Sequence, residues 1–192
     1  MAPDIPKKIS DAGLEKWYSS LPQDDAVRLS RYIGGADASS AYSFLSSVSN
    51  SALAEENHSF SVTVCEECLR MRLSDIQRFD ITEMLIEAYI GVKRYDDAKR
   101  MCGSGLDIFP RVSEQIKKRN NGTLPEKIAC RNRYIDIVVG IGSGYDEAFA
   151  LLRRFLTMGM ISQEEYAFRE RSLKIHRLQR SFDGVYTYTY KE

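Results

Sequence analysis

The stretch from residue 79 to residue 110, FDITEMLIEAYIGVKRYDDAKRMCGSGLDIFP, decides the fold that this sequence predicts. It contains two apolar faces with helical spacing, separated by a short break at Lys93-Arg94. The residues of these faces are Ile81, Leu85, Ala88, Tyr89 and Val92, then Ala98, Met101, Cys102, Leu106 and Phe109. This spacing is typical of amphipathic α-helices. We therefore predict a helical hairpin here, with Pro110 ending its second helix.

The same pattern recurs 50 positions further along the chain. The tetrapeptide YDDA at 95–98 corresponds to YDEA at 145–148, and Leu85 corresponds to Ile135. Acidic residues suit the first turn of a helix because they face the positive end of its dipole. The alanine is small enough to let the second helix lie close against the first. The sequence therefore predicts two repeat-like helix pairs.

This arrangement resembles the tetratricopeptide repeat, a family of stacked helical hairpins. The landmarks that residues 79–110 share with the family are Leu85, Tyr89, Tyr95, Ala98 and Pro110. Residues 132–160 match more weakly. The resemblance implies an all-α fold of stacked antiparallel helical hairpins, and an irregular helical bundle is the alternative to a tetratricopeptide-like α-solenoid.

The resemblance also implies a non-catalytic scaffold that binds a protein or peptide on the concave face of its first helices. The positions that face the groove in the family are Asp80, Glu83, Glu87 and Ile90 in the first pair, and Arg133 and Ile137 in the second. The three acidic residues share one side of a helix, so we expect a partner segment with basic character. The alternative is an ordinary solvated surface.

The remaining segments organise around these pairs as one helical domain. Residues 59–65 alternate like a strand but also fit a helical stripe, which we prefer, and residues 185–190 alternate in an extended pattern. The predicted organisation is a flexible leader at 1–9, a helical domain at 10–182 (N-terminal helices 10–75, the two pairs 76–160, a C-terminal helix 162–182) and an extended tail at 183–192.

Composition narrows the classes of function. The formal net charge is zero, which argues against a nucleic-acid partner because such binding relies on neutralising phosphates. There is no signal-peptide-like start and no apolar run of about 18 residues, so we expect a cytoplasmic protein without a membrane partner. The four cysteines are then expected as reduced thiols.

Two motifs offer competing chemistry. In YIDIVVGIGSGYDEAF (134–149), a β-branched run precedes Gly140, Gly142 and Gly144, as in a small enzyme that binds a nucleotide or S-adenosylmethionine. That interpretation requires a strand before the glycines. Cys65-Glu-Glu-Cys68 suggests zinc, but the glutamates favour a helix and no second close pair of ligands follows. We therefore predict no metal and no cofactor, and assign no catalytic residue.

Overall fold

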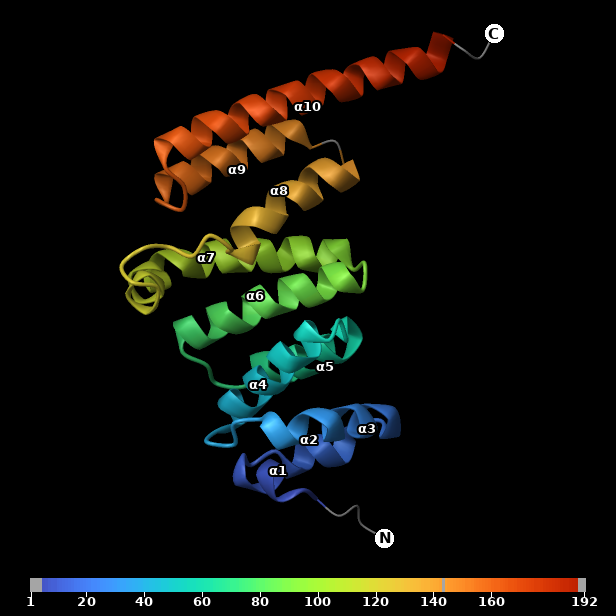
Figure 1. Ribbon diagram of the computed structural model, residues 1–192, viewed down its shortest axis with the longest axis vertical. Helices are drawn as coiled ribbons and strands as arrows, with labels where there is room; N and C mark the ends of the chain where they lie inside the picture. Colours follow the sequence, from blue (N-terminus) through green and yellow to red (C-terminus); the bar gives the residue numbers. More distant parts are fainter. Residues whose placement is uncertain (1–4, 143, 190–192) are drawn as a thin grey trace. The chain divides into compact units, whose positions relative to one another are not determined.

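The computed structural model describes the backbone of residues 5–142 and 144–189, and the side chains of residues 5–140 and 144–181. Over these residues the protein is all-α, as the sequence predicts, and contains no strand (Figure 1). None of the helices so described combines the length and apolar character that crossing a membrane requires. In chain order the helices are α1 (Lys7–Asp11), α2 (Glu15–Ser20), α3 (Gln23–Tyr32), the 3₁₀ turn η1 (Ile33–Gly35), α4 (Ala41–Ala54), α5 (His58–Leu69), α6 (Asp75–Gly91), α7 (Tyr95–Arg119), α8 (Ala129–Gly142), α9 (Tyr145–Thr157) and α10 (Gln163–Thr189).

The chain divides into two compact units, where the sequence predicted one helical domain over 10–182. Unit 1 ends at Cys130 and unit 2 begins at Arg131. In unit 1, α4 packs on α5, α5 on α6 and α6 on α7, and α4 also contacts α6. These contacts make two neighbouring helical hairpins, α4–α5 and α6–α7, which bury Phe44, Phe60, Leu85, Leu106 and Phe109 almost completely.

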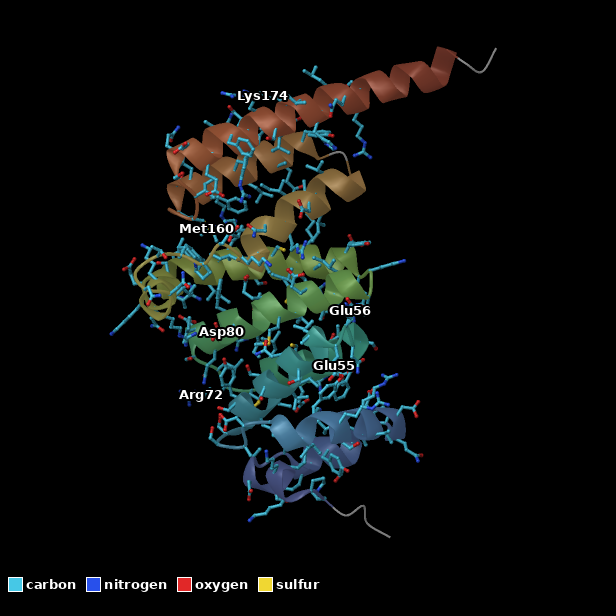
Figure 2. All side chains as sticks on the ribbon, viewed as in Figure 1. Glu55, Glu56, Arg72, Asp80, Met160 and Lys174 are labelled. Atoms are coloured by element: carbon cyan, nitrogen blue, oxygen red, sulfur yellow. The ribbon has the colours of Figure 1, made fainter. Side chains whose placement is uncertain are left out.

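Both hairpins of unit 1 turn in the same way. The residue that follows the C-cap of the first helix is left-handed, with φ of 57° at Glu56 (Figure 2) and 61° at Lys93. The next residue, Asn57 or Arg94, then donates its N–H to the carbonyl five residues earlier, at 2.8 Å in each case. This is the closure of a Schellman motif, which satisfies carbonyls at a helix end.

The α4–α5 hairpin is a unit that the sequence reading did not identify. Ser61 lies in its second helix at the place of Ala98 in α7, four residues after the turn, and both side chains are fully buried. The buried Ser61 hydroxyl is satisfied by Ser49 Oγ at 2.7 Å, and Ser49 also lies 2.9 Å from Cys65 Sγ. Serine is a weak helix former, so the many serines of this segment concealed the helical pattern of the hairpin in the sequence.

Unit 2 consists of α9, α10 and α8 from Arg131 onward. The α9 and α10 helices pack together and bury Ala148, Leu152 and Phe155. Tyr145 Oη lies 2.8 Å from His176 Nδ1, which links the first residue of α9 to the middle of α10. The tetrapeptide YDEA therefore begins a helix, as YDDA does in unit 1.

Pro110 does not end its helix, contrary to the prediction. Helix α7 continues through it to Arg119, and the proline is exposed. A proline inside a helix costs about 3 kcal/mol relative to alanine. Beyond it, Val112 and Ile116 extend the buried face of α7, so apolar burial offsets that cost. Residues 111–119 are therefore the last third of α7.

The two ends of the chain also differ from the prediction. Helix α1 begins at Lys7 and Ile9 is completely buried, so residues 7–9 of the predicted leader are helical, and its residues 1–4 lie outside the described part. Helix α10 extends to Thr189, so the tail predicted at 183–192 is helical over 183–189, and residues 190–192 lie outside the described part. Residues 60–64 lie within α5, which confirms the preferred helix.

Replacing Ala148 with Leu should destabilise the protein by roughly 1–3 kcal/mol, because the added atoms overpack a site with no exposed surface. Ala150→Leu is the matched control, since Ala150 is exposed on the same helix. Urea denaturation followed by circular dichroism measures both. Equal stability of the two variants would show that the start of α9 is not a close-packed position.

Candidate functional site

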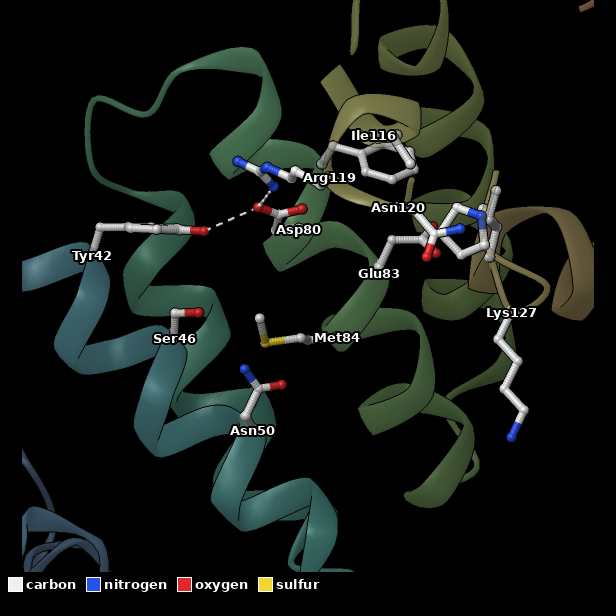
Figure 3. A pocket seen from close by; sticks show the side chains of 13 residues that line it. Tyr42, Ser46, Asn50, Asp80, Glu83, Met84, Ile116, Arg119, Asn120 and Lys127 are labelled. Carbon is white, nitrogen blue, oxygen red and sulfur yellow. Dashed lines mark hydrogen bonds and ion pairs between the residues drawn. The ribbon is translucent and has the colours of Figure 1, made fainter. Parts of the chain in front are cut away.

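A groove of about 480 Å³ lies within unit 1, between α4 and α6 on one side and the end of α7 with the following loop on the other (Figure 3). It opens on the first helices of the two hairpins. Its lining residues are Tyr42, Ser46, Asn50, Phe79, Asp80, Glu83, Met84, Ile116, Arg119, Asn120, Pro125, Lys127 and Ile128. Polar groups from three helices and a loop therefore meet at one hollow.

Helix α4 supplies a polar wall. Tyr42, Ser46 and Asn50 are four residues apart and so share one face, while Phe44 and Val48 are buried in the core. The Tyr42 hydroxyl donates to Asp80 at 3.2 Å, and burial together with the Asp80 charge raises the pKa of Tyr42 to about 12. The phenol is therefore neutral at physiological pH and acts as a donor.

Helix α6 supplies Asp80 and Met84. Asp80 accepts from Arg119 of α7 at 2.9 Å as well as from Tyr42, so its charge is matched within the chain. The Met84 side chain lies beside Ser46 and Asn50 and adds an apolar surface to the groove (Figure 3). Asn50 is exposed, and among the described residues its amide has no hydrogen-bond partner.

Glu83, at the edge of the groove, binds the backbone at the start of α8. Its Oε1 accepts the backbone N–H of Cys130 at 2.9 Å, and its Oε2 accepts that of Ala129. These N–H groups begin α8 and have no partner within their own helix. Burial raises the pKa of Glu83, and the two N–H bonds oppose that rise. The carboxylate therefore caps a helix from a distant part of the sequence.

The predicted groove residues are thus only partly brought together. Asp80 and Glu83 line the groove, whereas the lining does not include Glu87 or Ile90. On α8, Ile137 is 6 % exposed and belongs to the core. Arg133 is exposed on the same helix.

In unit 2 a separate hollow of about 610 Å³ lies between α8 and α10. It is lined by other positions of α8 than those predicted, Ile135 and Val139 among them. Successive side chains of a helix point about 100° apart, so positions of α8 two residues from the predicted ones face a different direction.

Sequence reasoning missed the wall on α4 and the residues from α7 and the loop. A signal for the wall existed, because Tyr42, Ser46 and Asn50 repeat at helical spacing. No local signal pointed to Arg119 or Lys127, which reach the groove only through the packing of α7 on α6.

The glycine-rich segment lacks the context that a nucleotide site requires. Residues 134–142 lie in α8, so no strand precedes the glycines, and Gly144 is the N-cap of α9. A β-carbon at Gly144 would lie 2.7 Å from a Val138 side-chain carbon. Gly144 therefore serves the close turn between two helices.

The cysteines are buried thiols. Burial raises the pKa of Cys65 to about 11 and of Cys68 to about 12, so both are protonated at physiological pH. Cys102 and Cys130 are also buried and form no disulfide. Within the part of the chain that the structure describes, no group of three His, Cys, Asp or Glu residues is placed to hold a metal ion.

Comparison with known proteins adds no relative: no protein-family model, curated protein or solved structure matches this chain.

Glu83→Leu should lower the free energy of unfolding by about 1–3 kcal/mol, because two N–H groups at the start of α8 lose their acceptor. Glu83→Gln keeps one acceptor oxygen, so its free energy of unfolding should lie between those of Glu83→Leu and the wild type. Glu114→Leu is the control: its carboxylate is exposed and its pair with Lys117 is a surface pair, worth at most about 1 kcal/mol. A Glu83→Leu protein as stable as the control would refute the capping role.

Proposed function

We propose that this protein is a non-catalytic scaffold that holds a segment of another protein in the groove of unit 1. The observation that carries the proposal is the Asn50 amide, which is exposed in the groove beside Met84 and has no hydrogen-bond partner among the described residues. An amide side chain both donates and accepts, so it can pair with the N–H and C=O of an extended backbone. Such pairing requires no particular side chain from the ligand.

The groove also offers apolar and charged contacts at defined places. Met84 and Pro125, which are partly exposed, can contact an apolar side chain of the bound segment. Lys127 has no ion-pair partner among the described residues and lies at the loop side of the groove. A segment that alternates apolar and polar residues fits this lining.

The charges of the groove change the kind of partner we expect. The sequence predicted a basic segment on the strength of an acidic stripe. The Asp80 carboxylate forms an ion pair with Arg119, and the Glu83 carboxylate accepts hydrogen bonds from two backbone N–H groups. We therefore propose a segment that is held mainly by backbone hydrogen bonds and apolar contacts, with basic character as a lesser contribution. The four buried cysteines form no disulfide, which fits a reducing compartment, and we propose the cytoplasm as the place of action.

The proposal is tested by selecting peptides from a random display library on the immobilised full-length chain and measuring the affinity of the enriched ones. Asn50→Ala should weaken binding about three- to tenfold, the loss of one or two hydrogen bonds. Ser46→Arg, which places a long side chain in the groove, should abolish binding.

Gln23→Ala is the matched control, because it removes an exposed side-chain amide from α3, outside the groove. Its affinity should equal that of the wild type, and all three variants should melt like the wild type. Peptides that bind the Ser46→Arg protein as tightly as the wild type would show that the groove is not the binding site. Failure to enrich any peptide would contradict the scaffold function itself.

A further inference from the structure

The hollow of unit 2, which lies between α8 and α10, plays no part in the function proposed for unit 1. Its volume is about 610 Å³, against about 480 Å³ for the groove. Sites for small molecules commonly measure about 300–1,000 Å³ and combine apolar walls with a few polar groups. The hollow has the size of such a site, so the chemistry of its lining decides what it can bind.

Two arginines attach α8 to the rest of unit 2. Arg131, which is 5 % exposed, donates to the carbonyl of Met160 at 2.7 Å. Arg180 of α10 donates to the carbonyl of Val139 at 3.0 Å. These bonds lie on either side of Ile135, which lines the hollow. The wall that α8 supplies is therefore held in place at two points.

The apolar surface of the hollow is aliphatic. Val139 and Leu173 are nearly buried, whereas Ile135 is partly exposed and Ile175 is 50 % exposed. The two isoleucines therefore present most of the apolar surface that a ligand would contact. Among the described residues that line the hollow, none has a phenyl, phenol or indole ring on which a base or other flat ring could stack. This lining fits an aliphatic ligand.

Gly140 leaves open space at the hollow. A β-carbon added there would meet no atom within 4 Å, so no neighbouring group requires a glycine. The φ angle of Gly140 is not left-handed, so the backbone does not require one either. Glycine destabilises a helix relative to alanine. What glycine supplies at this position is room beside α8, and no group of the described chain occupies it.

Two polar side chains of α10 have hydrogen-bonding capacity left for a ligand. His176 bonds Tyr145 Oη through Nδ1 at 2.8 Å, and its Nε2 has no partner among the described residues. The exposed Gln179 amide makes no hydrogen bond with the described residues. Gln179 follows His176 by three positions, so the two side chains share one side of the helix. An amide both donates and accepts, which suits a head group that does the same.

The charges around the hollow favour a neutral head group. The carboxylate of Asp136 lines the side formed by α8 and opposes an anion. The guanidinium of Arg180 lies at the carbonyl of Val139, another lining residue, and opposes a cation. A charged head group would also lose hydration on entering the hollow. An uncharged group avoids all three costs.

The length of the lining limits the size of the ligand. Along α10 the lining extends from Ser172 to Gln179, about 10 Å of helix at 1.5 Å per residue. An extended chain of about eight carbon atoms, with bonds of about 1.5 Å, spans this distance. A partner helix of about 12 residues would be about 18 Å long and would extend beyond the hollow. The dimensions therefore favour a small molecule over a helical segment of another protein.

We propose that the hollow of unit 2 binds a small aliphatic molecule with a neutral head group that donates and accepts hydrogen bonds, as an alcohol or a primary amide does. The aliphatic body contacts Ile135 and Ile175 and occupies the space beside Gly140. The head group pairs with the Gln179 amide and with Nε2 of His176. This inference concerns unit 2 and does not depend on the function proposed for the groove of unit 1.

Titration of the full-length, nitrogen-15-labelled chain with n-octanol, followed by NMR, tests the site. Saturable shifts should appear at the backbone amides of residues 135–140 and 172–179, and octanamide should compete for the same site. Removing two buried methylenes, in n-hexanol, should weaken binding at least tenfold, since each is worth about fourfold in affinity. Octanoate and octylammonium should also bind at least tenfold more weakly than n-octanol.

Two of the possible results of this titration would overturn the proposal. The first is the absence of saturable binding of n-octanol up to its solubility limit, or shifts that are confined to other residues. The second is a charged analogue that binds within tenfold of n-octanol, which would contradict the neutral head group.

Gly140→Leu fills the open space and should weaken n-octanol binding at least tenfold. It should melt no lower than the wild type, because leucine favours a helix more than glycine does. Ala150→Leu is the matched control, since it adds a leucine at an exposed position of α9 that does not line this hollow, and it should bind like the wild type. Gln179→Ala, at an exposed position, should weaken binding about three- to tenfold. Wild-type affinity in either Gly140→Leu or Gln179→Ala would overturn the proposal.

Discussion

Each helical hairpin of unit 1 depends on a close approach between two helices at a small, fully buried side chain. Ser61 occupies this place in the α4–α5 hairpin and Ala98 in the α6–α7 hairpin. A left-handed residue at each turn, Glu56 or Lys93, reverses the chain within a few residues and so fixes where the second helix begins. Once the turn is fixed, the small residue falls one helical turn later, where the helices meet.

The groove follows from this packing. Because α4 and α6 are the first helices of neighbouring hairpins, their polar faces come to lie beside each other, with Asn50 on one and Asp80 on the other. The far end of α7 then supplies Arg119, which it can do only because the helix continues past Pro110. The geometry of the candidate site is thus a consequence of two hairpins and one unusually long helix.

The acidic side chains on α6 show how a local pattern and a tertiary role can diverge. Asp80 and Glu83 share a helix face, which the sequence indicates, and both line the groove. Their charges, however, are engaged by Arg119 and by the N–H groups that begin α8, residues far away in the chain. A single sequence contains no information on such distant partners. It therefore predicted acidic side chains available to a ligand, whereas in the structure Asp80 and Glu83 already have partners within the chain.

The sequence by itself determined the all-α class, the hairpin at 79–110 and the helix start at YDEA, because helical periodicity and turn residues act over a few neighbouring positions. Only the tertiary structure decided that Pro110 lies inside a helix, that Ser61 matches Ala98, and that Ile137 is a core residue. These outcomes depend on how much apolar surface is buried between segments that are distant in the chain. That free energy is a property of the packed helices and cannot be assigned to any one stretch of sequence.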